Sequence, residues 1–373
     1  MVKICFVTAA RSEYGLLKWI MQDVANMSNV QMQLIVTGAH LLKEQGYTVE
    51  QIVEDGFVID RQIHIDMDLS SVKGIAKSMG IIGQKMVDAL DELKPDFIVV
   101  LGDRYELLPI CNAAFVMRIP IIHISGGDVT EGAIDDGVRN AITMLATYHF
   151  PSTIESMDNI VRMRNSKENV WAVGEPGLDA FNRMQLLSRQ ELASILDLDI
   201  NKQWILFTYH AETTKDLEYN LATVQNCMQS IAKYKDMQVV CTYANADFGG
   251  KQINEYLEDV SKNNENIITV PSLGQLKYLS LMKQVKFVMG NSSSGIVEAP
   301  FLSIPVINIG ERQKGRYQCA NVYQCGNTEQ EMDYAINTVL NRTVDGEDLF
   351  FWGDGHTSER IISIIHKIIL GDC

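Results

Sequence analysis

The chain has 373 residues, of which 46% are hydrophobic and 21% are charged, the balance of an ordinary soluble globular protein. Its net charge of −15 argues against nucleic acid as the main partner, because a phosphate backbone is bound by a basic surface. No apolar run reaches the roughly 20 residues that a membrane-spanning helix needs, so we expect no membrane partner either.

The start of the chain and its cysteines favour a cytoplasmic location. The first apolar run is short and is soon interrupted by Arg11 and Glu13, so it predicts a first strand and not a signal peptide. The seven cysteines are dispersed, odd in number and without a CxxC pair. Such a set indicates reduced thiols in the core and not a disulfide framework.

Apolar runs alternate with amphipathic segments along the first half of the chain. Helices are expected at Tyr14–Met27 and Gly74–Leu93. Near-continuous apolar strands that alternate with helices are typical of a parallel sheet covered on both faces. The strand candidates are KICFVTA (3–9), MQLIVTG (32–38), DFIVVLGD (96–103) and PIIHISGG (120–127).

The same pattern restarts in the second half, after a junction that contains Gly174, Pro176 and Gly177. The sequence therefore predicts an α/β protein with two doubly wound domains, at 1–174 and 175–355. A C-terminal segment at 356–373 carries an amphipathic helix that we expect to pack back on the first domain. The five further strand candidates are QWILFTYH (203–210), MQVVCTYAN (237–245), NIITVP (266–271), VKFVMGNSS (285–293) and IPVINIGE (304–311).

Polar clusters follow almost every predicted strand. Ligands of such sheets bind outside the carboxyl ends of the strands, so we expect the site in the cleft between the two domains. A single polar residue at a strand end is usually only a helix cap, but seven such clusters are harder to explain in that way. They contain Arg11 with Ser12, Asp103 with Arg104, the acidic stretch after Ser125, Tyr209 with His210, Asn245, GNSSSG (290–295) and GERQKGR (310–316).

The stretch GNSSSGIVEAP (290–300) predicts a phosphate site. A loop of small residues between a strand and a helix offers backbone N–H groups and hydroxyls to a phosphate. Glu298, about two turns into the helix, can accept hydrogen bonds from a ribose diol. An ordinary serine-capped helix is the alternative. Arg312, Lys314 and Arg316 either cover a phosphorylated ligand or form a solvated basic loop.

The stretch HISGGDVTEGAIDDGVRNA (123–141) gathers Asp128, Glu131, Asp135 and Asp136 within nine residues. Three interpretations compete: a metal site, an acid/base site, and a solvated start of a helix. The spacing is not that of an EF-hand. Crowded carboxylates do not all ionise alike, so such a group can supply both an acid and a base. Outside it, His210 at the tip of a buried strand is either structural or a donor to a leaving phosphate.

Six motifs, in this order, resemble the hydrolysing UDP-N-acetylglucosamine 2-epimerases of bacterial sialic-acid pathways. They are TAARSEYG, TGAHL, LGDRYE, HISGGDVTEGAIDDGVRNAITML, GNSSSGIVEAP and GERQKGR. The resemblance implies a GT-B-like pair of Rossmann-type domains that close on the nucleotide sugar, and a reaction without metal or bound NAD. It also implies the chemistry: loss of the C2 proton and of UDP gives a glycal, and addition of water then gives N-acetylmannosamine.

The resemblance also implies roles for single residues. Asp103 and Asp135 match acidic residues implicated in proton transfer, and His210 matches a histidine placed near the diphosphate. Glu298 would hold the ribose, and the two serines would hold the phosphates. The positions expected to bind the nucleotide sugar are Arg11, His40, Arg104, Asn245, Ser292, Ser293, Glu298 and Arg312.

This chain departs from the family pattern in the acidic stretch. Many relatives read HIEGGE where this chain reads HISGGD, so Ser125 replaces a candidate catalytic glutamate. Asp128 can take over the work of that carboxylate, and we count it among the catalytic candidates. Relatives also commonly have Arg-His where this chain has Arg139-Asn140.

Several functions remain open at this point. The leading hypothesis is hydrolysis of UDP-N-acetylglucosamine, and the close alternative is a nucleotide-linked diacetamido-trideoxy sugar. A non-hydrolysing epimerase is disfavoured by ARSEYG and GNSSSG, which resemble the hydrolysing branch. A GT-B glycosyltransferase would need an acceptor site, and a non-catalytic sensor would not need paired aspartates. By analogy with the family we expect a homodimer.

Overall fold

The computed structural model describes residues 1–43, 46–65, 71–131, 134–245 and 247–371, which form two compact units. Unit 1 comprises Met1–Val129, Asp135–Asn182 and Trp352–Cys373, and unit 2 comprises Thr130–Ile134 and Arg183–Phe351. The units therefore change at 182/183 and 351/352, where the sequence predicted 174/175 and 355/356. The reason is that residues 175–182 bond to the C-terminal segment of unit 1; the Asn182 amide, for example, donates to the Asp354 carbonyl (3.2 Å).

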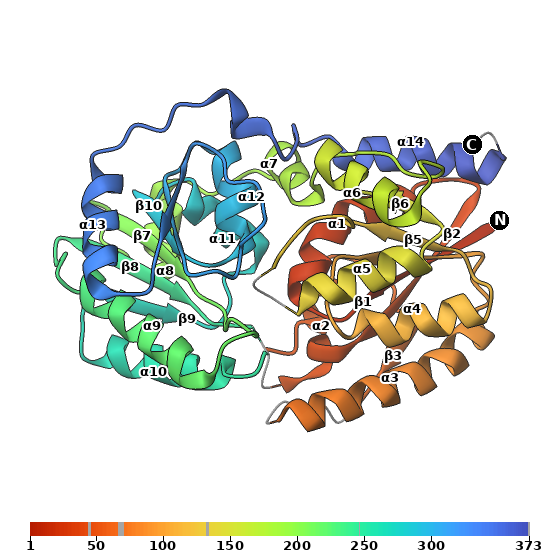
Figure 1. Cartoon of the computed structure of the whole chain (residues 1–373), viewed down its shortest axis with the longest axis horizontal. Coiled ribbons are helices and arrows are strands. Elements are labelled where there is room, and N and C mark those ends of the chain that lie inside the picture. Colours follow the sequence, from red (N-terminus) through yellow and green to blue (C-terminus); the bar gives the residue numbers. More distant parts are fainter. Residues whose placement is uncertain (44–45, 66–70, 132–133, 246, 372–373) are drawn as a thin grey trace. The chain divides into compact units, whose positions relative to one another are not determined.

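Unit 1 is built on a six-stranded parallel sheet in the order β3-β2-β1-β4-β5-β6 (Figure 1). This is the strand order of a Rossmann-type fold, which winds outward in both directions from β1 and β4. The strands are β1 (Val2–Thr8), β2 (Val30–Thr37), β3 (Arg61–Ile63), β4 (Phe97–Leu101), β5 (Ile121–Ile124) and β6 (Tyr148–Phe150). The helices are α1 (Arg11–Ala25), α2 (Val49–Glu54), α3 (Val72–Leu93), α4 (Leu107–Val116), α5 (Asp135–Leu145), α6 (Ile154–Arg164), α7 (Asp179–Arg183) and α14 (Thr357–Leu370), with 3-10 turns η1 (Gly38–Leu41) and η3 (Pro176–Leu178).

Unit 2 repeats this plan with a second six-stranded parallel sheet, in the order β12-β11-β10-β7-β8-β9. Numbered from its own first strand, this sheet has the same strand order as the sheet of unit 1. The predicted α/β class with two doubly wound sheets is confirmed. The strands are β7 (Gln203–Thr208), β8 (Met237–Thr242), β9 (Ile267–Val270), β10 (Phe287–Gly290), β11 (Val306–Ile309) and β12 (Val322–Cys325). The helices are α8 (Arg189–Leu196), α9 (Leu217–Ile231), α10 (Gly250–Lys262), α11 (Gly274–Met282), α12 (Ser293–Phe301) and α13 (Glu329–Leu340), with the 3-10 turn η4 (Glu347–Phe350).

The strands that the sequence did not predict are β3, β6 and β12, and all three are edge strands. They have three or four residues each, and β3 and β12 keep exposed or half-buried side chains. An edge strand is short and often covered on one side only, so it lacks the continuous apolar run by which the central strands were recognised.

The two faces of β1 explain why its sequence is apolar throughout. Ile4 and Phe6 are buried in the core beneath α1 and α14, whereas Cys5 and Val7 are buried in a separate core that includes residues of α3 and α4. Successive side chains of a strand point to opposite faces, so a central strand covered on both sides must be apolar at every position.

The sequence predicts reduced cysteines in the core and no membrane-spanning helix, and the described residues bear on both predictions. All six cysteines in these residues are buried and free, while Cys373 lies outside them. In the same part of the chain no helix has both the length and the apolar character that crossing a membrane requires.

The C-terminal helix α14 packs against α1 in unit 1 (Figure 1). Its first turn is held by Asp179, a residue of α7 that is 1% exposed. The Asp179 carboxylate accepts the backbone N–H groups of Thr357 (2.8 Å) and Ser358 (2.7 Å) and the Ser358 hydroxyl. The first N–H groups of a helix have no partner within the helix, so this carboxylate serves as the cap of α14.

Replacement of Asp179 by Ala should destabilise unit 1 strongly. The substitution leaves two buried N–H groups and a hydroxyl without an acceptor, and we expect a loss of about 3 kcal/mol in the free energy of unfolding. Urea denaturation followed by tryptophan fluorescence measures it. Asp354→Ala is the matched control, because the ion pair of Asp354 with Arg360 is largely exposed and should contribute roughly 0–1 kcal/mol. Equal losses in the two variants would contradict the capping role.

Candidate active site

Each sheet has one point at which the order of strands reverses, and ligands of such sheets bind there, outside the carboxyl ends. In unit 1 this point lies between β1 and β4, and in unit 2 it lies between β10 and β7. In unit 2 the two strands approach closely at Gly290. A Cβ atom at this residue would lie 1.9 Å from the Thr208 carbonyl oxygen, so only glycine fits.

The end of β1 presents Arg11 at the first position of α1, where its side chain is exposed. The loop before it is held by Glu13, which is 4% exposed and accepts the N–H groups of Ala9 (2.7 Å) and Ala10 (3.2 Å). Burial raises the pKa of Glu13 to about 8. Glu13 therefore fixes the backbone from which Arg11 projects.

His40 and Arg104 also lie near these strand ends, but both are enclosed. His40 is fully buried, with its ring nitrogens bonded to the hydroxyls of Thr8 (3.0 Å) and Thr48 (2.8 Å), and burial lowers its pKa to about 4. The Arg104 guanidinium makes a two-pronged contact with buried Glu106, at 3.2 and 3.0 Å. Both residues are thus held by protein groups, and their role in substrate binding stays a prediction.

Asp103 follows β4 and forms an ion pair with Arg139 of α5. The Arg139 side chain is 1% exposed, while the Asp103 side chain is 25% exposed. The same guanidinium donates to the carbonyl of Asp128 (2.9 Å) and reaches the carboxylate of Asp136 (3.4 Å). Arg139 therefore ties together three acidic residues, through the carboxylates of Asp103 and Asp136 and the backbone carbonyl of Asp128. We call Asp103, Asp128 and Asp136, with Arg139, the carboxylate edge.

The acidic stretch does not act as one cluster. Asp128 is 7% exposed and accepts a hydrogen bond from the Ser156 hydroxyl (2.7 Å). Asp135 begins α5 and is partly exposed. Glu131 belongs to unit 2, where its backbone N–H donates to the Lys314 carbonyl (2.9 Å) and its carboxylate faces the Lys314 ammonium (3.7 Å). Among the described residues, which omit 132–133 of this stretch, no group of three or more His, Cys, Asp and Glu is arranged to hold a metal ion.

In unit 2 His210 follows β7 and is held from two sides. The buried Asn291 side chain accepts the His210 backbone N–H and donates to its carbonyl, both at 2.8 Å. The His210 Nδ1 atom accepts the backbone N–H of Asn245 (3.1 Å). Because Nδ1 is an acceptor, the proton of the neutral ring is on Nε2. Asn245 thus orients His210 through its backbone.

The serine loop, Asn291–Ser294, follows β10 and opens α12. The Ser292 hydroxyl caps the helix by accepting from the Ser294 N–H (3.4 Å), and Ser293 is exposed. The Asn291 carbonyl accepts hydrogen bonds from Arg312 (3.2 Å) and from the Gln313 amide (2.9 Å). The loop therefore combines a helix N-terminus, hydroxyls and a guanidinium, the groups that bind phosphates.

Glu298 lies farther along α12 and is partly buried. Burial raises its pKa to about 7, and the nearby Arg316 charge opposes the rise. A carboxyl group with this pKa is poised between its neutral and ionised forms near neutral pH.

Sequence reasoning did not assign functions to Arg139, Asn291 or Glu175. Arg139 lies three residues after Asp136 on α5, a spacing that could have indicated the ion pair. From the sequence, Asn291 is only one residue of the serine loop, and Glu175 belongs to the junction between the domains. In the structure Glu175 is 7% exposed and accepts hydrogen bonds from Ser152 (2.5 Å) and Ser125 (3.4 Å). No local pattern predicts the contacts of Asn291 or of Glu175, because their partners are distant in the sequence.

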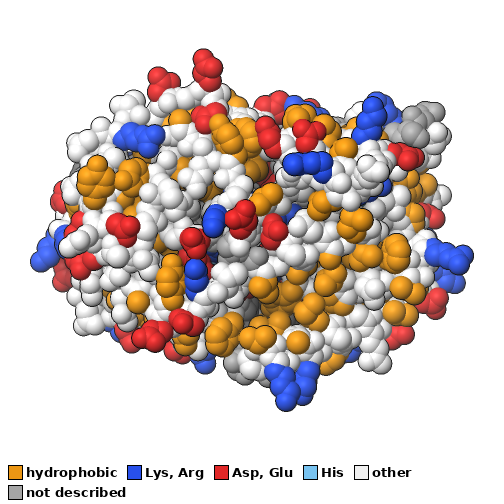
Figure 2. All heavy atoms as spheres, viewed as in Figure 1, with side chains coloured by type: hydrophobic (Ala, Val, Ile, Leu, Met, Phe, Trp, Pro, Cys, Tyr) orange, Lys and Arg blue, Asp and Glu red, His pale blue; other side chains and the backbone are white. Residues whose placement is uncertain are grey.

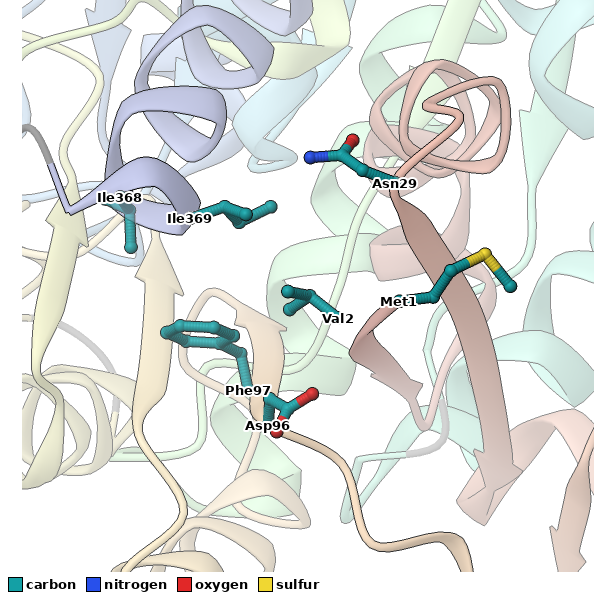
Figure 3. Close-up of a pocket in the computed structure, with 7 residues that line it drawn as sticks. All are labelled: Met1, Val2, Asn29, Asp96, Phe97, Ile368 and Ile369. Carbon is teal, nitrogen blue, oxygen red and sulfur yellow. The ribbon is translucent and has the colours of Figure 1, made fainter.

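Unit 1 also has an open pocket of about 710 Å³ at the opposite ends of its strands (Figure 3). In Figure 3 the Asp96 carboxylate and the Asn29 amide lie among apolar side chains of β1, β4 and α14. Because ligands of parallel sheets bind at the carboxyl ends, this pocket is not the candidate site. It is lined by Met1, Val2, Asn29, Asp96, Phe97, Ile368 and Ile369.

Comparison with known proteins places these features in a family. The model of the family described as UDP-N-acetylglucosamine 2-epimerase matches residues 22–366. The chain is 36% identical to the GDP/UDP-N,N'-diacetylbacillosamine 2-epimerase (hydrolyzing) of Campylobacter jejuni, over 86% of this chain and 83% of that protein. It is 30% identical to the UDP-N,N'-diacetylbacillosamine 2-epimerase (hydrolyzing) of Legionella pneumophila, over 100% of this chain and 98% of that protein.

A solved structure supports the same fold. The UDP-GlcNAc 2-epimerase of Neisseria meningitidis, bound to UDP-GlcNAc, superposes with a TM-score of 0.81 at 19% identity, covering 98% of this chain and 100% of that one. At this identity the likeness concerns the fold alone, whereas the family match spans most of the sequence. The chain belongs to the UDP-N-acetylglucosamine 2-epimerase family.

Proposed function

We propose that this enzyme is a hydrolysing 2-epimerase of UDP- or GDP-linked N,N'-diacetylbacillosamine. The observation that carries the proposal is the ion pair of Asp103 with buried Arg139 at the switch point of unit 1. This pair fixes a carboxylate where ligands of such sheets bind. The two relatives named above are hydrolysing enzymes for this sugar. From the sequence motifs, a diacetamido-trideoxy sugar is the close alternative to N-acetylglucosamine, and the two relatives favour it.

The proposed reaction has two steps. A carboxylate of the carboxylate edge removes the proton from C2 while the C1–O bond to the nucleotide diphosphate breaks, which leaves a double bond between C1 and C2. Water then adds its oxygen to C1, and a proton returns to C2 from the opposite face, which gives the free 2-epimer. Negative charge develops on the leaving diphosphate, and the serine loop, Arg312 and His210 are suited to stabilise it.

UDP-N-acetylglucosamine is the second candidate substrate, with N-acetylmannosamine and UDP as products. The description of the matched family and the six motifs of the sequence favour it. It would place the enzyme before sialic acid synthesis. The position of the binding site that the sequence predicts stays a prediction, as does the cytoplasmic location.

The substrate is identified by incubating the protein in heavy water with each sugar nucleotide and recording proton NMR spectra. We expect free nucleotide diphosphate and the free 2-epimer with deuterium at C2, with the larger kcat/KM for the diacetamido sugar. Asp103→Asn should lose release of the diphosphate while it still binds UDP, because it removes the base and leaves unit 2 unchanged. A larger kcat/KM for UDP-N-acetylglucosamine would select the second candidate.

Two results would contradict the proposal. Return of an intact nucleotide sugar, epimerised at C2, would identify a non-hydrolysing epimerase. Turnover only after an acceptor sugar is added would identify a glycosyltransferase.

The affinity for UDP should rise with pH through the pKa of Glu298. In the free protein this carboxyl is protonated below about pH 7, and a ribose diol is bound best by the ionised form. If only the ionised form binds, affinity increases about tenfold from pH 6 to pH 8. Isothermal titration calorimetry should show this slope in the wild type and its loss in Glu298→Gln. The control Glu329→Gln, on the exposed face of α13, should keep it.

We propose that the protein is a homodimer that uses the outer face of α4 and α5. Phe115 and Val116 of α4 are 54% and 70% exposed, and Met144 of α5 is 55% exposed. Figure 2 shows apolar side chains gathered on this side of unit 1. Apolar side chains that gather on one exposed face are typical of protein–protein contacts.

Sedimentation velocity tests the dimer. We expect Phe115→Asp to sediment as a monomer, because a charge replaces an apolar contact at the interface. Tyr334→Asp, at a residue of unit 2 that is 67% exposed, should remain dimeric. A monomeric wild type at micromolar concentration would refute the proposal.

A further inference from the structure

Ser125 has a backbone conformation that calls for an explanation. It follows β5 with φ of +56°, in the left-handed region that L-residues other than glycine avoid. Three other described residues with this conformation, Lys94, Asn165 and Asp197, end helices, where it is common. Ser125 ends no helix, and two glycines follow it directly. Glycine would adopt this conformation at a lower cost in free energy, so the contacts of the Ser125 hydroxyl are of interest.

The hydroxyl of Ser125 points to a buried carboxylate. It donates to Glu175 Oε2 (3.4 Å), and the same oxygen accepts the Ser152 hydroxyl (2.5 Å). All three residues are at most 9% exposed. Hydrogen bonds of this kind are often long in ligand-free sites and shorten when substrate binds. The proton of the Ser125 hydroxyl is thus committed to Glu175, and the oxygen is left as an acceptor.

The chain brings Glu175 to this position by running alongside β6. Trp171 donates to the His149 carbonyl (3.0 Å), Val173 to the Pro151 carbonyl (2.9 Å) and Gly174 to the Ser152 carbonyl (3.1 Å). The segment is parallel to β6, as the bridge between His149 and Val170 shows. It therefore ends at the carboxyl edge of the sheet, where Asp103 and Asp128 lie.

Ser125 and Asp103 follow two neighbouring strands of the sheet. β4 and β5 pair in register from Ile98 with Ile121 to Leu101 with Ile124. Asp103 comes two residues after the end of β4, and Ser125 comes directly after β5. A group that binds the substrate next to the reacting carbon is expected at this place.

We propose that the Ser125 oxygen accepts a hydrogen bond from the amide N–H that both candidate sugars carry at C2. Ser125 is then a substrate-binding residue, and Glu175 is a positioning residue that turns the hydroxyl so that its lone pairs face the substrate. The inference rests on the proposed function, because it requires a 2-acetamido sugar nucleotide as substrate. It gives the site a means of recognising the acetamido group beside the atom that reacts.

The test uses Ser125→Gly, with Ser303→Gly as the matched control. Ser303 has nearly the same backbone angle, φ of +55°, and is exposed in unit 2. Glycine relieves the backbone cost at both positions, so neither variant should melt at a lower temperature than the wild type. Ser125→Gly should lose about tenfold in kcat/KM for diphosphate release, as expected for one hydrogen bond to substrate, whereas Ser303→Gly should lose nothing. Full activity of Ser125→Gly would overturn the proposal.

A double-mutant cycle tests the role of Glu175. Glu175→Ala removes the acceptor that holds the Ser125 proton, so the hydroxyl is no longer oriented and the variant should lose about as much activity as Ser125→Gly. Because Glu175 acts through Ser125, the double variant should lose no more than either single variant. Glu175→Asp should recover part of the loss, and all variants should bind UDP as the wild type does.

The outcomes separate this inference from the proposed function. Losses that multiply in the double variant, or a loss of UDP affinity in Ser125→Gly, would overturn the inference alone. A wild type that releases no diphosphate from either sugar nucleotide would overturn the proposed function.

Discussion

The constraint on which the rest of the structure depends is the winding of each parallel sheet in two directions from its centre. A parallel sheet needs a crossover between successive strands, and covering both faces requires the direction of winding to reverse once. At that reversal the loops of two neighbouring strands diverge and leave their carboxyl ends accessible. The chain makes this reversal between β1 and β4 and again between β7 and β10, and the candidate residues follow these strands or their neighbours.

The two sheets have the same strand order but are followed by different kinds of polar side chain. Unit 1 carries carboxylates after its strands; Arg139 holds those of Asp103 and Asp136, and Ser156 donates to that of Asp128. Unit 2 ends its strands in an imidazole, hydroxyls and the guanidinium of Arg312. The proposed elimination calls for groups of both kinds, because the proton and the leaving group depart from adjacent carbons.

Buried polar side chains fix the geometry of both sets. Arg139 bonds three segments of unit 1. In unit 2 the Asn291 side chain bonds the residue after β7, and its backbone carbonyl accepts from the loop that carries Arg312. A buried polar group without partners costs free energy, so each of these residues is held in one arrangement. Ser125, whose backbone is left-handed, is likewise held by its hydrogen bond to Glu175.

The sequence by itself determined the α/β class, the central strands and the strand ends at which polar residues gather, because a strand buried on both faces must be apolar until it ends. It could not determine the edge strands β3, β6 and β12, whose side chains are too few or too exposed to form such a run. The junction with Gly174, Pro176 and Gly177 lies within unit 1, because Asp179 and Asn182 bond to the C-terminal segment. Only the tertiary structure brought Arg139 to Asp103, Asn291 to His210 and Glu175 to Ser125. These contacts join residues that are 36 to 81 positions apart, and no local pattern of residues encodes a partner at that distance.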